Sequence, residues 1–122
     1  MRAVRGAITV QTDSRTEILN ATEKMLTELM KKNDLTKEQV VSAVFTATPD
    51  LQSCYPAEAA RKMGWVDTPL MCAAEIAVRG GLSRCIRVLL HLKVESDGKT
   101  IHPVYLRDAK KLRPDLLKEE NK

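Results

Sequence analysis

The stretch GGLSRCIRVLLHL, residues 80–92, decides the fold of this chain. Successive side chains of an extended strand point to opposite faces, so alternate residues from Ile86 to Val94 form one continuous apolar face. The other face carries Arg87, Leu89, His91 and Lys93. A guanidinium is always charged and has five donors, so it is costly to bury without an anionic partner. The stretch therefore predicts a half-buried strand that presents Arg87 to an anion.

Four other arginines stand in comparable settings along the chain: Arg5, Arg61, Arg107 and Arg113. Guanidiniums that face a common space form a pocket for a small polyanion. Glu75, in the stretch MCAAEIAV at residues 71–78, is also surrounded by small and apolar residues. A carboxylate in that setting either pairs with one of the arginines or contacts the ligand itself.

Length and composition indicate one globular domain. The chain has 122 residues, of which 43% are hydrophobic and 30% are charged. No apolar run approaches the roughly 20 residues that span a membrane, and no signal-peptide pattern opens the sequence. The three cysteines, Cys54, Cys72 and Cys85, show no metal-binding or disulfide spacing. We therefore expect reduced thiols and a cytoplasmic location.

The charge balance favours an anionic metabolite over nucleic acid as the partner. The net charge is +4, from 20 basic and 16 acidic residues, and no basic run is longer than two residues. Proteins that bind nucleic acid usually add a continuous basic stripe or stacking aromatic side chains. This chain has four aromatic residues: Phe45, Tyr55, Trp65 and Tyr105.

The local patterns predict a mixed α/β domain with more strands than helices. Residues 2–10 alternate as a strand, and Ser14 with Glu17 forms a capping-box pattern for a long helix that reaches about Lys32. A second capping box, Thr36 with Gln39, precedes a buried strand at 40–47. We expect a short helix from Pro56 to Gly64.

In the second half of the chain, strands are predicted at 69–73, at 85–95 and at 101–106. The sequence SDGK at 96–99 is typical of a hairpin turn between the last two strands. Residues 1–117 would form the single domain, and the charged end at 118–122 would fray.

Several catalytic devices have no sequence signature here. There is no Gly-rich phosphate loop, no Gly-x-Ser-x-Gly, no metal-ligand cluster and no visible triad. We interpret His91 and His102 as structural, and Cys72 more readily as a small core residue than as a nucleophile. An enzyme built from this chain would work by positioning and electrostatics, without a cofactor or a metal.

An ordered set of short motifs resembles one family, the monofunctional chorismate mutases of the small trimeric α/β-barrel class. The motifs are VRGA at 4–7, TPDL at 48–51, YPA at 55–57 with Arg61, Cys72 with Glu75, GGL at 80–82, CIRV at 85–88, VYL at 104–106 and LRPDL at 112–116. The resemblance implies an α+β fold, with a mixed β-sheet packed against one long helix and three copies forming a pseudo-α/β-barrel. It also implies conversion of chorismate to prephenate for phenylalanine and tyrosine biosynthesis, in clefts between subunits.

The resemblance assigns a role to each site residue. Arg87 would donate to the ether oxygen and a carboxylate of chorismate, Arg5 would clamp a carboxylate, and Tyr105 would add a hydroxyl donor. Glu75 would accept a hydrogen bond from the ring hydroxyl of chorismate and balance the positive charge that develops on the ring. Cys72 would lie beside Glu75. The neighbouring subunit would wall the cleft with Tyr55, Ala57 and Arg61, and Arg113 would help to close its mouth.

Two positions carry no role in that assignment. Glu58 occupies a position that is lysine in some members of the class, so we interpret it as a rim residue. Arg107 matches no site position and is interpreted as structural. A non-catalytic trimer that binds a carboxylated metabolite, and a small nucleic-acid-binding module, remain as alternative interpretations.

Overall fold

A computed structural model describes residues 1–94 and 100–112. The chain runs through a strand, a long helix and a short 3-10 turn before its second strand: β1 (Arg2–Thr9), α1 (Arg15–Lys32), η1 (Lys37–Gln39) and β2 (Val40–Ala47). It continues as α2 (Ala57–Lys62), β3 (Leu70–Ala74), β4 (Cys85–Leu92), β5 (Val104–Leu106) and the 3-10 helix η2 (Arg107–Leu112). In this described part, no helix combines the length and apolar character that crossing a bilayer requires.

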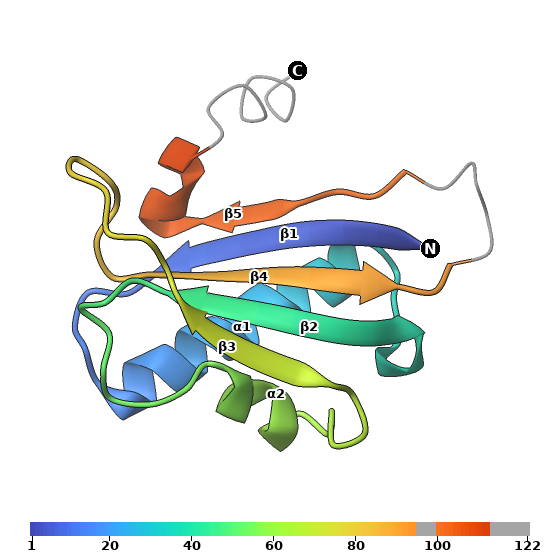
Figure 1. The fold of residues 1–122 in the computed structure, drawn as a ribbon. Helices are drawn as coiled ribbons and strands as arrows, with labels where there is room; N and C mark the ends of the chain where they lie inside the picture. Colours follow the sequence, from blue (N-terminus) through green and yellow to red (C-terminus); the bar gives the residue numbers. More distant parts are fainter. Residues whose placement is uncertain (95–99, 113–122) are drawn as a thin grey trace.

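The strands form one mixed five-stranded sheet in the order β3-β2-β4-β1-β5 (Figure 1). The central strand β4 runs antiparallel to both β1 and β2. The edge strands are parallel to their neighbours, β3 to β2 and β5 to β1. The expected mixed sheet packed against one long helix is confirmed.

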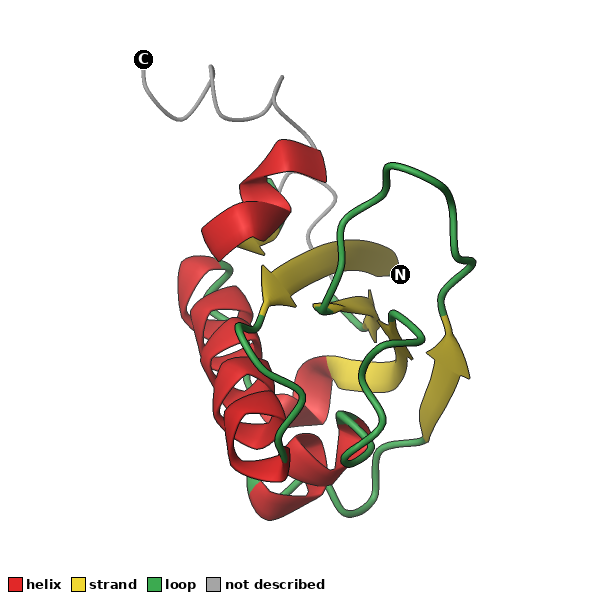
Figure 2. Cartoon of the chain, turned by 90° about the vertical axis from the view of Figure 1, so that its left-hand side faces the viewer, coloured by secondary structure: helices red, strands yellow, loops and turns green. Residues whose placement is uncertain are grey.

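Helix α1 begins where its capping sequence predicts and covers one face of the sheet (Figure 2). The Ser14 side chain accepts the Glu17 N–H at 3.1 Å. The reciprocal half of the box differs from expectation, because the Glu17 carboxylate accepts from the Gln11 N–H instead. The buried face of α1 consists of Ile18, Ala21, Thr22, Met25, Leu26 and Leu29.

A glycine lets this helix approach the sheet. A Cβ on Gly6 would lie only 2.6 Å from Cδ1 of Leu29. The close packing therefore leaves no room for a Cβ at this position of β1 unless the Leu29 side chain shifts.

The alternation predicted for β4 is confirmed. Its apolar face is no more than 2% exposed and consists of Ile86, Val88, Leu90 and Leu92. The opposite side chains, those of Arg87, Leu89 and His91, are half-buried. One face of the strand thus joins the core under α1, while the other is presented on the open side of the sheet.

The last strand does not form the hairpin that we expected. It pairs in parallel with β1, Tyr105 opposite Ala7, and does not pair with β4. The hydrogen-bonding edge of β4 is already occupied by β1 along its whole length, from Arg2–Leu92 to Thr9–Cys85. The strand begins at Val104 rather than at residue 101, because Pro103 has no N–H to donate to a ladder. The SDGK turn and the tail beyond Leu112 lie outside the described residues.

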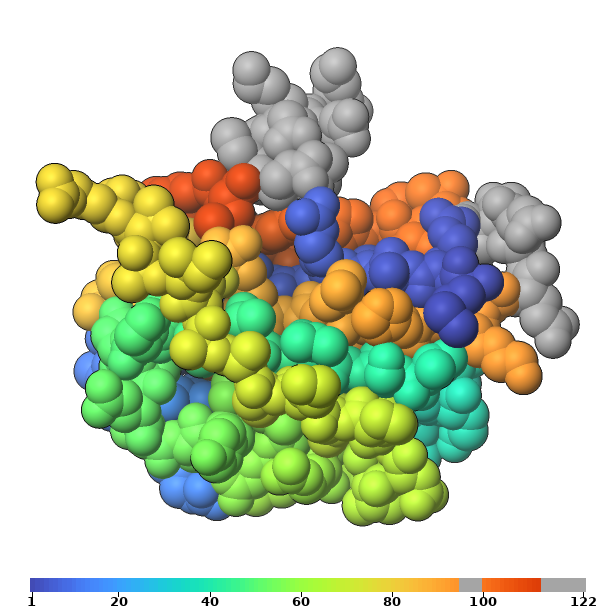
Figure 3. Space-filling view, in the orientation of Figure 1, coloured from blue at the N-terminus to red at the C-terminus, as the bar shows by residue number. Residues whose placement is uncertain are grey.

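The remaining elements agree with expectation to within two residues, whereas β4 ends at Leu92, short of the predicted end at residue 95. Pro56 precedes α2, and Gly64 follows it with a φ of +96°. The Thr36–Gln39 capping box is present. The segment between β3 and β4 projects from the body of the molecule, as Figure 3 shows in yellow.

Candidate active site

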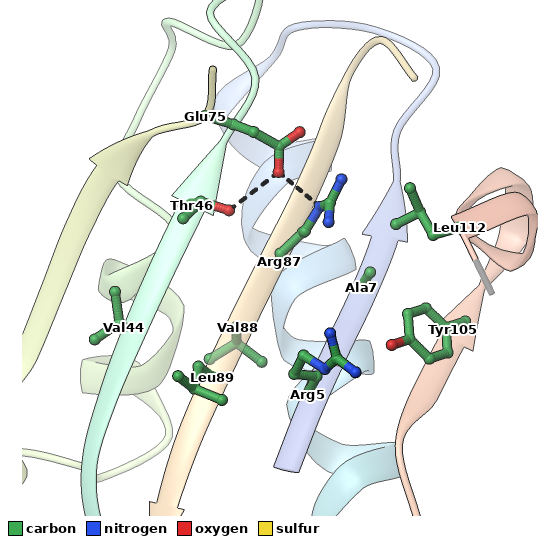
Figure 4. Close-up of a pocket in the computed structure, with 11 residues that line it drawn as sticks. Arg5, Ala7, Val44, Thr46, Glu75, Arg87, Val88, Leu89, Tyr105 and Leu112 are labelled. Atoms are coloured by element: carbon green, nitrogen blue, oxygen red, sulfur yellow. Dashed lines mark hydrogen bonds and ion pairs between the residues drawn. The ribbon is translucent and has the colours of Figure 1, made fainter. Parts of the chain in front are cut away.

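A cavity of about 500 Å³ opens on the face of the sheet that α1 leaves uncovered. Figure 4 shows side chains from β1, β2, β4 and β5 around it, with Glu75 and Leu112 at one end. The cavity is lined by Arg5, Gly6, Ala7, Val44, Thr46, Glu75, Arg87, Val88, Leu89, Tyr105 and Leu112.

Strand register places the principal side chains in one row across the sheet. Thr46 pairs with Arg87, Arg87 with Ala7, and Ala7 with Tyr105. Arg5 lies two residues from Ala7 on the same strand and therefore on the same face. Ala7 is 1% exposed, and its small side chain leaves room between Arg87 and Tyr105.

An ion pair joins Arg87 to Glu75 across β2. Nε of Arg87 lies 2.6 Å from Oε1 of Glu75, and the Thr46 hydroxyl donates to the same oxygen at 3.4 Å. The Nε atom is buried and its N–H is not aligned for a hydrogen bond, so the contact is chiefly one between charges. The Glu75 N–H donates to Ala47 O at 2.9 Å, which fixes the residue just beyond β3.

Arg5 and Tyr105 add two donors to the same cavity (Figure 4). The guanidinium of Arg5 has no carboxylate partner among residues 1–94 and 100–112, and the Tyr105 hydroxyl has no hydrogen-bond partner there. Both groups are thus available to an anion. Together with Arg87 they form a polar arc around a space walled by Val44 and Leu89.

Cys85 lies below this arc in a small cluster with Ala7 and Ala109. Its burial raises the pKa of the thiol to about 11, although the nearby Arg87 opposes the shift. The thiol is therefore neutral near pH 7 and unsuited to nucleophilic attack. Within the described ranges, no group of three or more His, Cys, Asp or Glu residues could hold a metal ion.

Thr9 anchors the segment that follows Tyr105. Its hydroxyl accepts the Asp108 N–H at 3.1 Å, and its carbonyl accepts Nη1 of Arg107 at 3.0 Å. This contact is consistent with the structural role that we expected for Arg107. The next cavity residue, Leu112, is the last one described, and Arg113 lies outside the described residues.

The other predicted residues do not join this cavity within one chain. Tyr55 and Cys72 line a separate pocket of about 590 Å³. Ala57 is 2% exposed and packs in the main core, whereas Arg61 lies exposed on α2. The structure therefore brings together Arg5, Glu75, Arg87 and Tyr105, and leaves Cys72, Tyr55, Ala57 and Arg61 elsewhere.

The loop that carries Tyr55 is fastened to the start of α1 by contacts that sequence patterns did not reveal. Oδ1 of Asp13 accepts the N–H groups of Gln52 and Ser53 at 3.0 and 3.1 Å. Hydrogen bonds from Ser53 and Gln52 lower the pKa of Asp13. No periodic signal marks such side-chain contacts between loops.

Glu58 pairs with Arg15 through both carboxylate oxygens, and one of these contacts measures 2.7 Å. The hydrogen bond with Arg15 lowers the pKa of Glu58. The acidic charge on the first turn of α2 is therefore matched by a cation from α1. This pairing is consistent with a rim position for Glu58.

Known proteins resemble this chain over nearly its whole length. Residues 1–116 match the sequence model of chorismate mutase type I. The chain belongs to this family. Its cavity combines two guanidiniums, a hydroxyl and a carboxylate, which suits a substrate with two carboxylates.

Three relatives illustrate the similarity over nearly the whole chain. The chorismate mutase AroH of Bacillus subtilis (strain 168) is 39% identical over 122 residues, which cover 99% of this chain and 96% of that protein. AroH of Thermus thermophilus is 42% identical over 117 residues, covering 95% and 96%. The solved chorismate mutase from Clostridium thermocellum is 46% identical, with a TM-score of 0.87 over 90% of this chain and 98% of that one.

Proposed function

We propose that this chorismate mutase rearranges chorismate to prephenate by electrostatic stabilisation of the transition state. The observation that carries the proposal is the cavity in which Arg87, Arg5 and Tyr105 converge beside Glu75. The reaction is an isomerisation of one molecule and needs no nucleophile. Positioning and charge are therefore sufficient for catalysis.

Arg87 would act at the bond that breaks. During the rearrangement the ether C–O bond of chorismate lengthens while a new C–C bond forms, and negative charge grows on the ether oxygen. A guanidinium fixed beside that oxygen binds the transition state more strongly than the substrate, which lowers the barrier. Glu75 holds Nε of Arg87 at 2.6 Å, so the terminal nitrogens are the donors that would face the substrate.

The remaining groups would orient the substrate. Arg5 and the Tyr105 hydroxyl would bind a carboxylate, since both lack a partner within the described ranges. Glu75 would accept the ring hydroxyl and balance the positive charge that develops on the ring. Cys72, on β3, would contribute backbone or thiol contacts beside Glu75. Arg113, which follows Leu112 in the sequence, would help to close the mouth of the cleft.

We further propose that the active enzyme is a homotrimer whose sites lie between subunits. Apolar side chains lie exposed on β3, on the loop before α2 and on the segment after β3: Met71 is 66% exposed, Tyr55 71%, Ile76 83% and Val78 67%. A second subunit that covered this surface could supply Tyr55 and Arg61 to the cavity of its neighbour, with Ala57 packed beneath them. The isolated chain leaves that cavity open on one side.

The wider role would be one step of phenylalanine and tyrosine biosynthesis in the cytoplasm, without a membrane or nucleic-acid partner. A non-catalytic protein that binds a carboxylated metabolite would use similar arginines, but the family to which the chain belongs is named for catalysis.

Loss of chorismate ultraviolet absorbance on addition of purified protein tests the activity directly. We expect turnover in buffer without metal or cofactor, and a matching yield of prephenate. Tight binding of chorismate without turnover would instead favour the non-catalytic metabolite-binding protein.

A further inference from the structure

Tyr105 lies on the least supported strand of the sheet. Strand β5 contains three residues and lies at an edge, where β1 is its only partner among the described strands. Strands of this length at an edge have few ladder hydrogen bonds to set their position. The position of the Tyr105 hydroxyl therefore depends on what fixes the chain on either side of β5.

On the N-terminal side, that support comes from the side chain of Asn33. Its Oδ1 accepts the His102 N–H at 2.6 Å, and its Nδ2 donates to His102 O at 2.9 Å. The amide thus pairs with both backbone groups of one residue, as a neighbouring strand would. Asn33 is 2% exposed, so solvent cannot replace these hydrogen bonds.

The end of α1 holds the Asn33 amide in place. Nδ2 also donates to Leu29 O at 3.0 Å, within the same helix. Asp34 then turns the chain with a φ of +50°, and the Leu35 N–H donates to Met30 O at 2.8 Å. This pattern of hydrogen bonds is a Schellman motif, which fixes the helix end and the residue at its cap.

The chain between His102 and Tyr105 is short and restrained, so the position of His102 determines that of Tyr105. Only Pro103 and Val104 intervene, the proline ring fixes one backbone dihedral, and Val104 is buried opposite Gly6 in the ladder. Asp108 is held beyond the strand by Thr9. Asn33 and Thr9 therefore bracket the residue that faces the cavity.

We propose that Asn33 is a positioning residue for the reaction, and that it sets the Tyr105 hydroxyl against the substrate by holding His102. The inference rests on the proposed contact between Tyr105 and a substrate carboxylate. That carboxylate is present in both the ground state and the transition state, so loss of the contact should raise KM and leave kcat nearly unchanged. A purely structural role for Asn33 would instead reduce the amount of active enzyme, and with it kcat, at constant KM.

The test is a double-mutant cycle between Asn33→Ala and Tyr105→Phe, with Asn20→Ala, on the exposed side of α1, as the matched control. Loss of one hydrogen bond to a carboxylate predicts a KM for Tyr105→Phe that is at least about tenfold higher. We expect Asn33→Ala to raise KM at least about threefold, with kcat per folded site within about twofold of the wild type. The double variant should match Tyr105→Phe, because the hydroxyl on which Asn33 acts is already absent.

Each outcome is decisive. A normal KM for Asn33→Ala beside a raised KM for Tyr105→Phe overturns the positioning role alone. Multiplying effects in the double variant also overturn it, because Asn33 would then act independently of the hydroxyl. A normal KM for Tyr105→Phe overturns the proposed substrate contact, and the positioning role with it.

If Asn33→Ala does not fold, Asn33→Ser takes its place in the same cycle. Its hydroxyl can donate to Leu29 O at the end of α1, but it is too short to pair with both backbone groups of His102. The same outcomes then apply.

Discussion

Arg87 and Tyr105 face each other across a single alanine. Ala7 pairs with Arg87 of β4 on one side and with Tyr105 of β5 on the other. The row crosses three strands, so its spacing is set by the sheet rather than by a loop. The width of the cavity at this point depends on how small the side chain at position 7 is.

Replacement of Ala7 by valine should therefore fill the cavity between the two donors. Overpacking at a site that is 1% exposed would also destabilise the fold by about 1–3 kcal/mol. We expect kcat/KM to fall at least tenfold when it is measured where the protein remains folded by circular dichroism. Ala3→Val, on the same face at the distant end of β1, is the control. Full activity of Ala7→Val would mean that the substrate does not occupy this space.

Removal of the Arg87 guanidinium should reduce catalysis more than any other single change in the cavity. Loss of one transition-state donor costs about 3 kcal/mol or more, which corresponds to at least about 100-fold in kcat. Arg87→Lys keeps the charge but lacks the planar fork, and should recover only part of this loss. Arg79→Ala, on the exposed segment before β4, should behave as wild type. If Arg87→Ala turns over normally while Arg5→Ala does not, Arg5 is the central cation.

Mixing two inactive variants tests whether the site is shared. Arg61→Ala and Arg87→Ala proteins, unfolded together at equal concentration and refolded, should form mixed trimers. A site is intact only where one neighbour keeps Arg87 and the other keeps Arg61, so about a quarter of the sites should recover. Turnover per mixed trimer, with composition verified by mass spectrometry, measures the recovery. Its absence would assign both arginines to a site within one chain.

The pH profile of kcat should lack a bell shape between about pH 6 and 9, because the rearrangement transfers no proton. Burial raises the pKa of Cys85 to about 11, so its thiol stays neutral through this range. A chelator should have no effect on the rate. A titration near neutrality that disappears in a His91 or His102 variant would indicate acid–base chemistry.

The stability of the fold should decline at acid pH through the contacts around the start of α1. Hydrogen bonds lower the pKa of Asp13, Glu17 and Glu58 below their usual values of 3.8, 4.5 and 4.5. A lowered pKa stabilises the folded state above the unfolded pKa, and this contribution is lost as pH falls through the folded value. Urea unfolding from pH 7 to pH 3 should show a shallower acid decline for Glu58→Gln than for the wild type. Parallel curves would show that the Arg15–Glu58 pair contributes nothing to this decline.

Periodic features of the fold were predictable from the sequence. The alternation from Ile86 to Leu92 and the capped stripe of α1 identify their elements because burial on one face imposes a period on the residues. The partner of β5 was not predictable in the same way. A turn sequence suggests a local hairpin, but the edge of β4 had already been taken by β1, from the other end of the chain.

The candidate site was predictable in part for a similar reason. Arg87, Glu75, Arg5 and Tyr105 were identified by their apolar surroundings or by resemblance, and the structure brings them into one cavity. The supports of that cavity and of the loop that carries Tyr55 were missed. Asn33 and Asp13 act through hydrogen bonds to the backbone of distant segments, and such contacts leave no spacing pattern in the sequence.

The strict alternation of β4 also limits how genes for this enzyme can change in length. Insertion or deletion of one codon between Cys85 and Arg87 would shift the strand by one residue and reverse every later side chain. The guanidinium would then face the core under α1, and Val88, now 2% exposed there, would take its place in the cavity. Changes in length should therefore be confined to the connections outside the strands, such as the projecting segment between β3 and β4, where added residues leave the catalytic face unchanged.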